Sequence, residues 1–264
     1  MNKENLEIKK TLSLAFENHK KENFVIAEKL YKKILKYNPN YFDAIFLLGT
    51  LLIQIKNFDE GINLLKKAVL IQPNFADAHH NLGLAFVELK EFNLAIPYTQ
   101  KAIQLQPGNV EAYNNLGNIF KELRDFKKSK VCYEKAIQIK PNFVKAKNNL
   151  GNILKEQGRF TEAMNCYQEA IKLNPRQANA HYNLAVLFKV LGDFKNTIKS
   201  FQEVIKYEPK NLIAIYELSN LKKEILDHKL KNKIKSILAS NDDNYENYAY
   251  GNFLLSKYEL NNKK

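Results

Sequence analysis

The sequence is poor in the residues that interrupt helices or cross-link chains. Among its 264 residues there are nine Gly, seven Pro and two Cys, and there is no Trp. So little Gly and Pro argues against a sandwich, a barrel or a collagen-like chain and favours long helices. Two cysteines exclude a disulfide framework, and no apolar run reaches the roughly 18 residues that a bilayer span needs. We therefore expect a helical protein without a membrane span.

Positive charge is in excess, because 41 Lys and Arg residues face 28 Asp and Glu residues. The resulting net charge of +13 permits anionic partners, but it bears on solubility and encounter rather than on fold. The first ten residues lack the apolar core of a secretory signal. We expect a cytoplasmic protein in which Cys132 and Cys166 are small, buried and reduced.

The prolines recur at a fixed interval and show that the chain contains an internal repeat. Six of the seven prolines follow this interval, and only Pro97 departs from it: the six are Pro39, Pro73, Pro107, Pro141, Pro175 and Pro209. Two further columns have the same period, namely Phe24, Phe58, Phe92, Phe126, Phe160 and Phe194, and Leu14, Leu48, Leu82, Leu116, Leu150 and Leu184. The three columns predict six equivalent units.

Each unit predicts two amphipathic helices. In residues 110–143, apolar side chains recur at three- and four-residue steps before and after the break at Arg124-Asp125. Pro141 ends the second helix, because the residue before a proline disfavours the helical conformation. Glycines recur inside the first helices and predict a close crossing where no Cβ fits: Gly49, Gly83, Gly117 and Gly151. A single unit cannot bury its apolar faces, so stacked units must share one core.

This pattern resembles the tetratricopeptide repeat, a helix–turn–helix unit of about 34 residues. Residues 114–118 and 148–152 are similar to that family's first-helix core. The resemblance implies an all-α, right-handed superhelical solenoid of stacked antiparallel helix pairs. We expect six tetratricopeptide repeats in residues 1–211, with units starting near 8, 42, 76, 110, 144 and 178. Residues 212–264 then form a divergent seventh repeat and a terminal helix.

The predicted helix at residues 245–260 leaves two interpretations open. It is a terminal cap, although its aromatic residues make it more apolar than a cap requires, or the chain is a fragment of a longer protein. Residues 249–255 resemble part of bacterial proteins that join these repeats to a sulfotransferase domain. That resemblance implies an alternative function, the N-terminal substrate-recruiting arm of a larger transferase (sulfotransferase or glycosyltransferase) whose catalytic domain is missing from this chain.

The resemblance also implies that the first helices line a concave groove, which binds an extended segment of a partner protein. The family's groove positions hold mainly amide and basic side chains here. They are His80, Asn81, Asn114, Asn115, Asn118, Lys121, Lys145, Asn148, Asn149, Asn152, Lys155, Tyr182 and Asn183.

Four of these residues lie one repeat apart: Asn81, Asn115, Asn149 and Asn183. They resemble the asparagine ladder in the repeat arm of O-linked N-acetylglucosamine transferases. An amide carries both a donor and an acceptor, so such a ladder can bind a peptide backbone without selecting its side chains. The alternative interpretation is that Asn is abundant in this chain and is merely tolerated at the position.

The sequence predicts no catalytic residue, no cofactor and no metal site. It has no Gly-rich phosphate loop, metal-ligand spacing or nucleophile elbow. His79 and His181 share a column with Tyr113, which indicates packing rather than catalysis. The lysines are spread along the chain and the groove mixes them with glutamates, so we do not expect nucleic acid as a partner.

The carboxylate clamp of chaperone-binding members is a second family mode of binding. It matches this chain only at Asn115 and Lys145, or at Asn118 and Asn149 in the next register. A receptor for chaperone tails is therefore not expected. The sequence predicts a non-catalytic scaffold that binds a protein or peptide partner.

Overall fold

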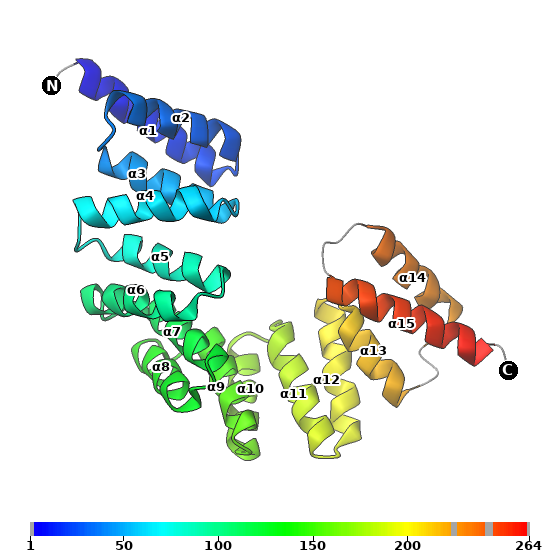
Figure 1. Cartoon of the computed structure of the whole chain (residues 1–264). Helices are drawn as coiled ribbons and strands as arrows, with labels where there is room; N and C mark the ends of the chain where they lie inside the picture. Colours follow the sequence, from blue (N-terminus) through cyan, green and yellow to red (C-terminus); the bar gives the residue numbers. More distant parts are fainter. Residues whose placement is uncertain (1–2, 223–225, 241–244, 263–264) are drawn as a thin grey trace. The chain divides into compact units, whose positions relative to one another are not determined.

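The computed structural model describes residues 3–222, 226–240 and 245–262 (Figure 1). These residues form helices joined by short turns, and no strand occurs among them. The chain separates into two compact units, an N-terminal unit of residues 1–141 and a C-terminal unit of residues 142–264. Within each unit, helices pack against their neighbours in chain order.

The N-terminal unit contains four helix pairs. The first helices of the pairs are α1 (Lys3–Lys20), α3 (Phe42–Gln54), α5 (Ala76–Glu88) and α7 (Val110–Glu122). The second helices are α2 (Phe24–Tyr37), α4 (Phe58–Ile71), α6 (Phe92–Leu105) and α8 (Phe126–Ile139). Each first helix packs most extensively against the second helix that follows it.

The C-terminal unit continues with two more pairs, α9 (Val144–Glu156) with α10 (Phe160–Leu173), and α11 (Ala178–Val190) with α12 (Phe194–Tyr207). Three further helices follow: α13 (Leu212–Leu221), α14 (His228–Ala239) and α15 (Tyr245–Asn262).

The predicted helix pairs are confirmed, and the sequence columns explain their ends. Every second helix of a pair begins at a residue of the Phe column. Each ends two residues before a proline, and the residue between is extended, as at Lys140 (φ −132°) and Asn174 (φ −138°). Steric conflict with the following proline ring excludes the helical conformation at these residues.

The predicted close crossing within pairs is also confirmed. A Cβ added at Gly117 would lie 2.5 Å from Cε1 of Tyr133, and one at Gly151 would lie 2.5 Å from Cε1 of Tyr167. Both tyrosine rings are fully buried. In these two pairs, glycine leaves the space that the tyrosine ring of the second helix occupies against the first helix.

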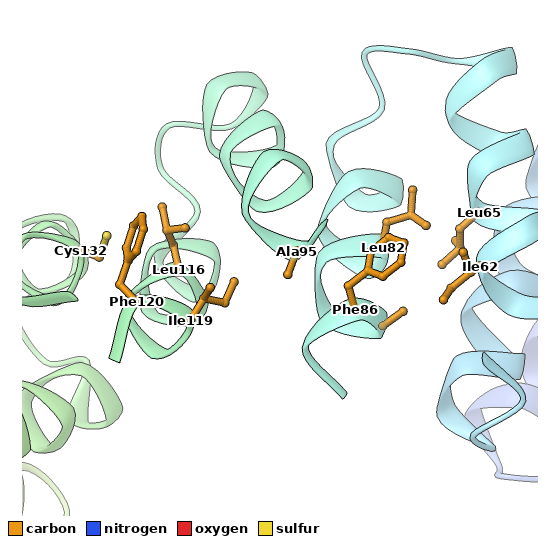
Figure 2. Packing of buried hydrophobic residues seen from close by; sticks show 10 residues of the cluster. Ile62, Leu65, Leu82, Phe86, Ala95, Leu116, Ile119, Phe120 and Cys132 are labelled. Carbon is orange, nitrogen blue, oxygen red and sulfur yellow. The ribbon is translucent and has the colours of Figure 1, made fainter. Parts of the chain in front are cut away.

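The apolar columns form a core that runs through successive pairs. In the N-terminal unit, one buried cluster has members on α4, α5, α6, α7 and α8, among them Leu65, Leu82, Phe86 and Leu116 (Figure 2). Members of the Leu column are buried from Leu48 onward, but Leu14 on α1 is 50% exposed. Leu48, Leu82 and Leu116 each share a buried cluster with residues of the preceding pair, whereas no described helix precedes α1.

The two cysteines differ in burial. Cys132 is buried in the cluster shown in Figure 2, and burial raises the pKa of its thiol to about 11. Cys166 is only half-buried, so the expectation that both are buried is wrong for this residue. It precedes the fully buried Tyr167 on α10 and lies closer to the solvent-facing side of this helix.

The last three helices depart from simple pairing. α15 packs against both α13 and α14, and their side chains share one apolar cluster that includes Leu212, Ile234 and Leu254. Asn247 Oδ1 accepts a hydrogen bond from the backbone N–H of Leu212 at 3.1 Å, at the start of α13. Lys257 donates to the carbonyl oxygen of Ser219 at 3.0 Å, near its end. The start of α15 thus lies at the start of α13, and a later part of α15 lies at the end of α13, so the two helices run parallel.

Candidate functional site

The amide column of the N-terminal unit consists of Asn81 on α5 and Asn115 on α7, both half-buried. The Thr50 hydroxyl donates to the Phe46 carbonyl oxygen at 2.9 Å, so its own oxygen is left to accept from Asn81 Nδ2, also at 2.9 Å. This arrangement fixes the orientation of the Asn81 amide. Its Oδ1 is then the atom that can accept from an N–H group of a ligand.

The amide column of the C-terminal unit consists of Asn149 on α9 and Asn183 on α11, again half-buried. Asn183 Nδ2 donates to Asn148 Oδ1 at 3.0 Å. Part of this column therefore joins one first helix to the next.

Two predicted groove residues lie in the packed interior. Asn114 is 6% exposed and Asn148 is 8% exposed, so the expectation that they face an open groove is corrected. Each precedes a column asparagine, and the helical turn of about 100° per residue directs it toward the neighbouring helices. Its bond to Asn183 shows that Asn148 positions the amide of that column residue.

Two further amides are held by buried tyrosines. The Tyr133 hydroxyl donates to Asn118 Oδ1 at 2.7 Å, and the Tyr167 hydroxyl donates to Asn152 Oδ1 at 2.7 Å. Burial raises the pKa of both phenols above the ordinary value, so each hydroxyl keeps its proton and remains a donor. Because Oδ1 accepts from the tyrosine, the NH₂ group is the part of each amide directed to other partners.

His80 lies in the same unit, on α5. Its Nδ1 is buried without a hydrogen-bond partner. Burial lowers the pKa of this imidazole, although the carboxylates of Asp77 and Glu111 act in the opposite direction. His80 is therefore a mainly neutral side chain at neutral pH.

The predicted groove lysines differ in their surroundings. Lys145 is exposed. Lys121 pairs with Glu122 at 3.0 Å, and Lys155 approaches Glu156 at 3.8 Å. Lys121 and Lys155 are half-buried and their glutamate partners are exposed, so these ion pairs lie at the surface and contribute little to tight binding.

Tyr182 lies on α11 in the C-terminal unit. Its ring meets Phe201 edge-on with centroids 5.7 Å apart. Burial raises the pKa of this phenol, and Glu217, Tyr250 and Glu246 act in the same direction. Two of these groups, Tyr250 and Glu246, belong to α15.

The structure also contains a cavity that the sequence interpretation missed. It is formed at α1 and α3, has a volume of about 390 Å³ and is open to solvent. Its apolar lining is Leu12, Phe16, Phe46, Leu47 and Phe75. The repeat itself contains the signal, because Phe46 and Leu47 precede His80 and Asn81 by one full repeat. Extending the groove columns toward the N-terminus would have found it.

His79 and His181 are buried, and each hydrogen-bonds through Nε2 to a proline carbonyl six residues earlier, Pro73 at 2.8 Å and Pro175 at 2.9 Å. The prediction that they are packing residues is confirmed. Among the described residues there is no cluster of three or more His, Cys, Asp or Glu able to hold a metal ion. No helix in the described part of the chain is long and apolar enough to span a membrane.

Family models match most of the repeat region. Models described as tetratricopeptide repeat match residues 20–83, 76–109, 110–143, 132–165 and 178–211, and one described as TPR repeat matches residues 151–192. The chain belongs to the tetratricopeptide repeat family. No catalytic family is indicated, and no curated protein matches the chain.

Solved structures show the same fold. A crystal structure of MamA is 30% identical over 62% of this chain and 96% of its own length, with a TM-score of 0.58. PilF of Pseudomonas aeruginosa is 18% identical over 84% of this chain and 100% of its own length, with a TM-score of 0.70. YrrB, described as a TPR protein with an unusual peptide-binding site, is 19% identical over 71% of this chain and 96% of its own, with a TM-score of 0.56.

Proposed function

We propose that this protein is a non-catalytic scaffold whose first helices bind an extended peptide segment of a partner protein. The observation that carries the proposal is a set of amides on the first helices whose orientation is fixed by hydrogen bonds to neighbouring hydroxyl groups. Thr50 orients Asn81, and buried tyrosine hydroxyls orient Asn118 and Asn152. Amides fixed in this way offer both donors and acceptors to a peptide backbone at little entropic cost.

The family and one neighbour support this proposal. Tetratricopeptide repeats are scaffolds typical of protein–protein interaction, and the neighbour YrrB has a peptide-binding site. The transferase-arm alternative gains no support, because no catalytic family is indicated for this chain. We also propose that residues 1–211 form six repeats and that residues 212–264 form a divergent region.

The test begins with a peptide library. Random dodecapeptides displayed on phage are selected on the immobilised full chain, and the enriched sequence is synthesised with a fluorescent label. Its affinity is measured by anisotropy for the wild type and for the double variant Asn81→Ala/Asn115→Ala, in which both changes lie in the N-terminal unit. Losing two backbone hydrogen bonds of about 1 kcal/mol each should weaken binding by roughly tenfold or more.

The matched control is Asn63→Ala/Asn165→Ala, which changes two exposed asparagines on the second helices α4 and α10. This variant should bind like the wild type. Equal affinity of both double variants would contradict the proposal. Binding that weakens steeply with salt and is displaced by nucleic acid would also contradict it, because that signature belongs to phosphate recognition.

A further inference from the structure

The cavity at the start of the N-terminal unit lies on the same helices as the proposed peptide site. With the exception of Phe75, which precedes α5, its lining comes from the first helices α1 and α3. Its volume of about 390 Å³ exceeds that of any single side chain and falls in the range of ligand-binding pockets.

Aromatic packing gives this cavity a fixed wall. The Phe75 ring meets Phe46 edge-on with centroids 4.9 Å apart, and it meets Phe42 in the same way at 5.0 Å. On the opposite side, Phe16 is 40% exposed and carries the Lys20 ammonium 4.4 Å from its ring centroid. A bulky apolar group entering the cavity would therefore find a preformed aromatic surface.

The cavity continues the columns of the amide site. One repeat after Phe46 and Leu47, the equivalent positions hold His80 and Asn81. Three repeats after Phe16, the equivalent position holds Asn118. In these columns apolar residues predominate on α1 and α3 and asparagines on α7, while α5 is mixed, with His80, Asn81 and Leu84. A segment lying on these helices would meet both surfaces.

An acidic column runs beside both surfaces. Asp43, Asp77 and Glu111 occupy equivalent positions of successive repeats on α3, α5 and α7, and all three are exposed. Within the described residues, none of these carboxylates is paired with a lysine or arginine. On α1 the equivalent position holds Lys9, which also lines the cavity, so it is the stretch of the column from α3 to α7 that favours an occupant with basic side chains.

We propose that the cavity binds one bulky apolar side chain of the partner peptide, and that basic residues next to it in the peptide lie along the Asp43–Glu111 column. This inference rests on the proposed function and adds to it a side-chain preference that the amides alone do not supply. The partner is thus an extended segment in which an aromatic or large aliphatic residue adjoins lysines or arginines.

The library selection described above gives the first readout. Peptides selected on the wild-type chain should be enriched in a bulky apolar residue next to basic residues. The selected peptide is then made with Trp at the apolar position. Because the protein has no Trp, the blue shift of peptide emission reports burial of that side chain without background.

Phe16→Asn is the pocket variant and Phe194→Asn is its matched control. Phe194 is 55% exposed and lies on the second helix α12. Phe16→Asn should abolish the blue shift and weaken the Trp peptide by about tenfold, the value expected for burying a large apolar side chain. Phe194→Asn should leave both unchanged. Thermal unfolding of both variants, followed by circular dichroism, verifies that they fold.

A second pair of variants tests the acidic column without touching the apolar wall. Asp43→Asn should weaken the peptide severalfold at low salt, and Asp59→Asn, at an exposed position on α4, should not. A selection without apolar enrichment, or a blue shift that persists in Phe16→Asn, would overturn the inference. A dimer of the free chain that Phe16→Asn dissociates would also overturn it, by assigning the cavity to a second copy.

The two proposals fail separately. If Asn81→Ala/Asn115→Ala weakens a peptide that lacks any apolar preference, the peptide site stands and the cavity inference falls. If Phe16→Asn weakens binding and the asparagine variant does not, the cavity inference stands and the amide ladder falls.

Discussion

Six residues that join the helices of a pair share one unusual backbone conformation. Glu22, Lys56, Lys90 and Arg124 have φ between 60° and 64°, and Gly158 and Gly192 occupy the equivalent positions with φ of 74° and 76°. Each of the six lies one repeat after the one before it. Only glycine adopts this left-handed region without cost; other residues lose roughly 1–2 kcal/mol.

Arg124→Gly should therefore stabilise the protein. Part of the gain is offset by the larger entropy of glycine in the unfolded chain, so we expect the free energy of unfolding to rise by about 0.5–1 kcal/mol. Gly158→Ala should lower it by about 1 kcal/mol, because the new Cβ is strained at that φ. Urea denaturation measures both. A destabilised Arg124→Gly protein would show that the arginine side chain outweighs the backbone strain.

The pKa of His80 makes stability depend on pH. Burial lowers this pKa from 6.5 in the folded protein, so below pH 6.5 the unfolded chain binds a proton at this site before the folded chain does. Stability contributed by neutral His80 is present above pH 6.5 and is lost as the pH falls.

His80→Asn, which introduces the residue found at the equivalent positions 114 and 148, should remove this dependence. Between pH 7.5 and 5.5 the wild type should lose more unfolding free energy than the variant, as measured by urea denaturation. The same substitution at the exposed His228 is the control and should follow the wild type. Equal losses in all three proteins would be inconsistent with a buried neutral His80.

At the scale of elements, a glycine, a tyrosine and an asparagine act together in two helix pairs. Gly151 admits the Tyr167 ring, and the Tyr167 hydroxyl holds Asn152. The sequence predicted the glycine contact from its column. It did not predict the bond to Asn152, because the apolar pattern of a helix does not specify where a buried hydroxyl points.

Tyr167→Phe tests whether Tyr167 is a positioning residue. The ring is retained and Phe201 already stands at the equivalent position, so the free energy of unfolding should fall by only about 1 kcal/mol for the lost hydrogen bond. Affinity for the selected peptide should fall severalfold, because the Asn152 amide loses its fixed orientation. The double variant with Asn152→Ala should bind no more weakly than Asn152→Ala alone. If the losses of peptide affinity in the two single variants add up in the double variant, Tyr167 affects binding independently of Asn152.

The terminal helices are where sequence patterns were least informative about packing. Apolar spacing predicted a helix over residues 245–260, and α15 is there. The spacing did not show that α15 would pack between α13 and α14, because this depends on polar contacts such as those of Lys257. Its Nζ lies 3.0 Å from the Ser219 carbonyl oxygen and 2.6 Å from Asn220 Oδ1, at the end of α13.

Lys257→Met should loosen α13. Methionine keeps the apolar stem but removes the cation that interacts with the last carbonyl groups of the helix, an effect of about 1 kcal/mol. Hydrogen exchange should become faster across α13 in this variant. Lys235→Met, at an exposed position on α14, is the control and should leave that exchange unchanged.

At the scale of the whole molecule, stability arises from contacts between neighbouring helix pairs. The Pro, Phe and Leu columns were sufficient to predict this, since each has a direct steric consequence at a helix end or in a shared core. The roles of individual side chains were harder to predict from the sequence, as Asn114 and Asn148 show. Their residue type matches the groove pattern, but their burial depends on neighbouring side chains that the pattern does not specify. The apolar cavity was missed because its residues differ in type from those at later equivalent positions.

Amide recognition of a peptide is the central claim, and the side-chain NH₂ signals of asparagine report on it directly. Titrating the ¹⁵N-labelled full chain with the selected peptide should shift the side-chain signals of Asn81, Asn115, Asn118 and Asn152, assigned with single Asn→Ala variants. Signals of Asn63 and Asn165 on the second helices should stay in place. Shifts confined to the second helices, with the first-helix amides unmoved, would contradict the account.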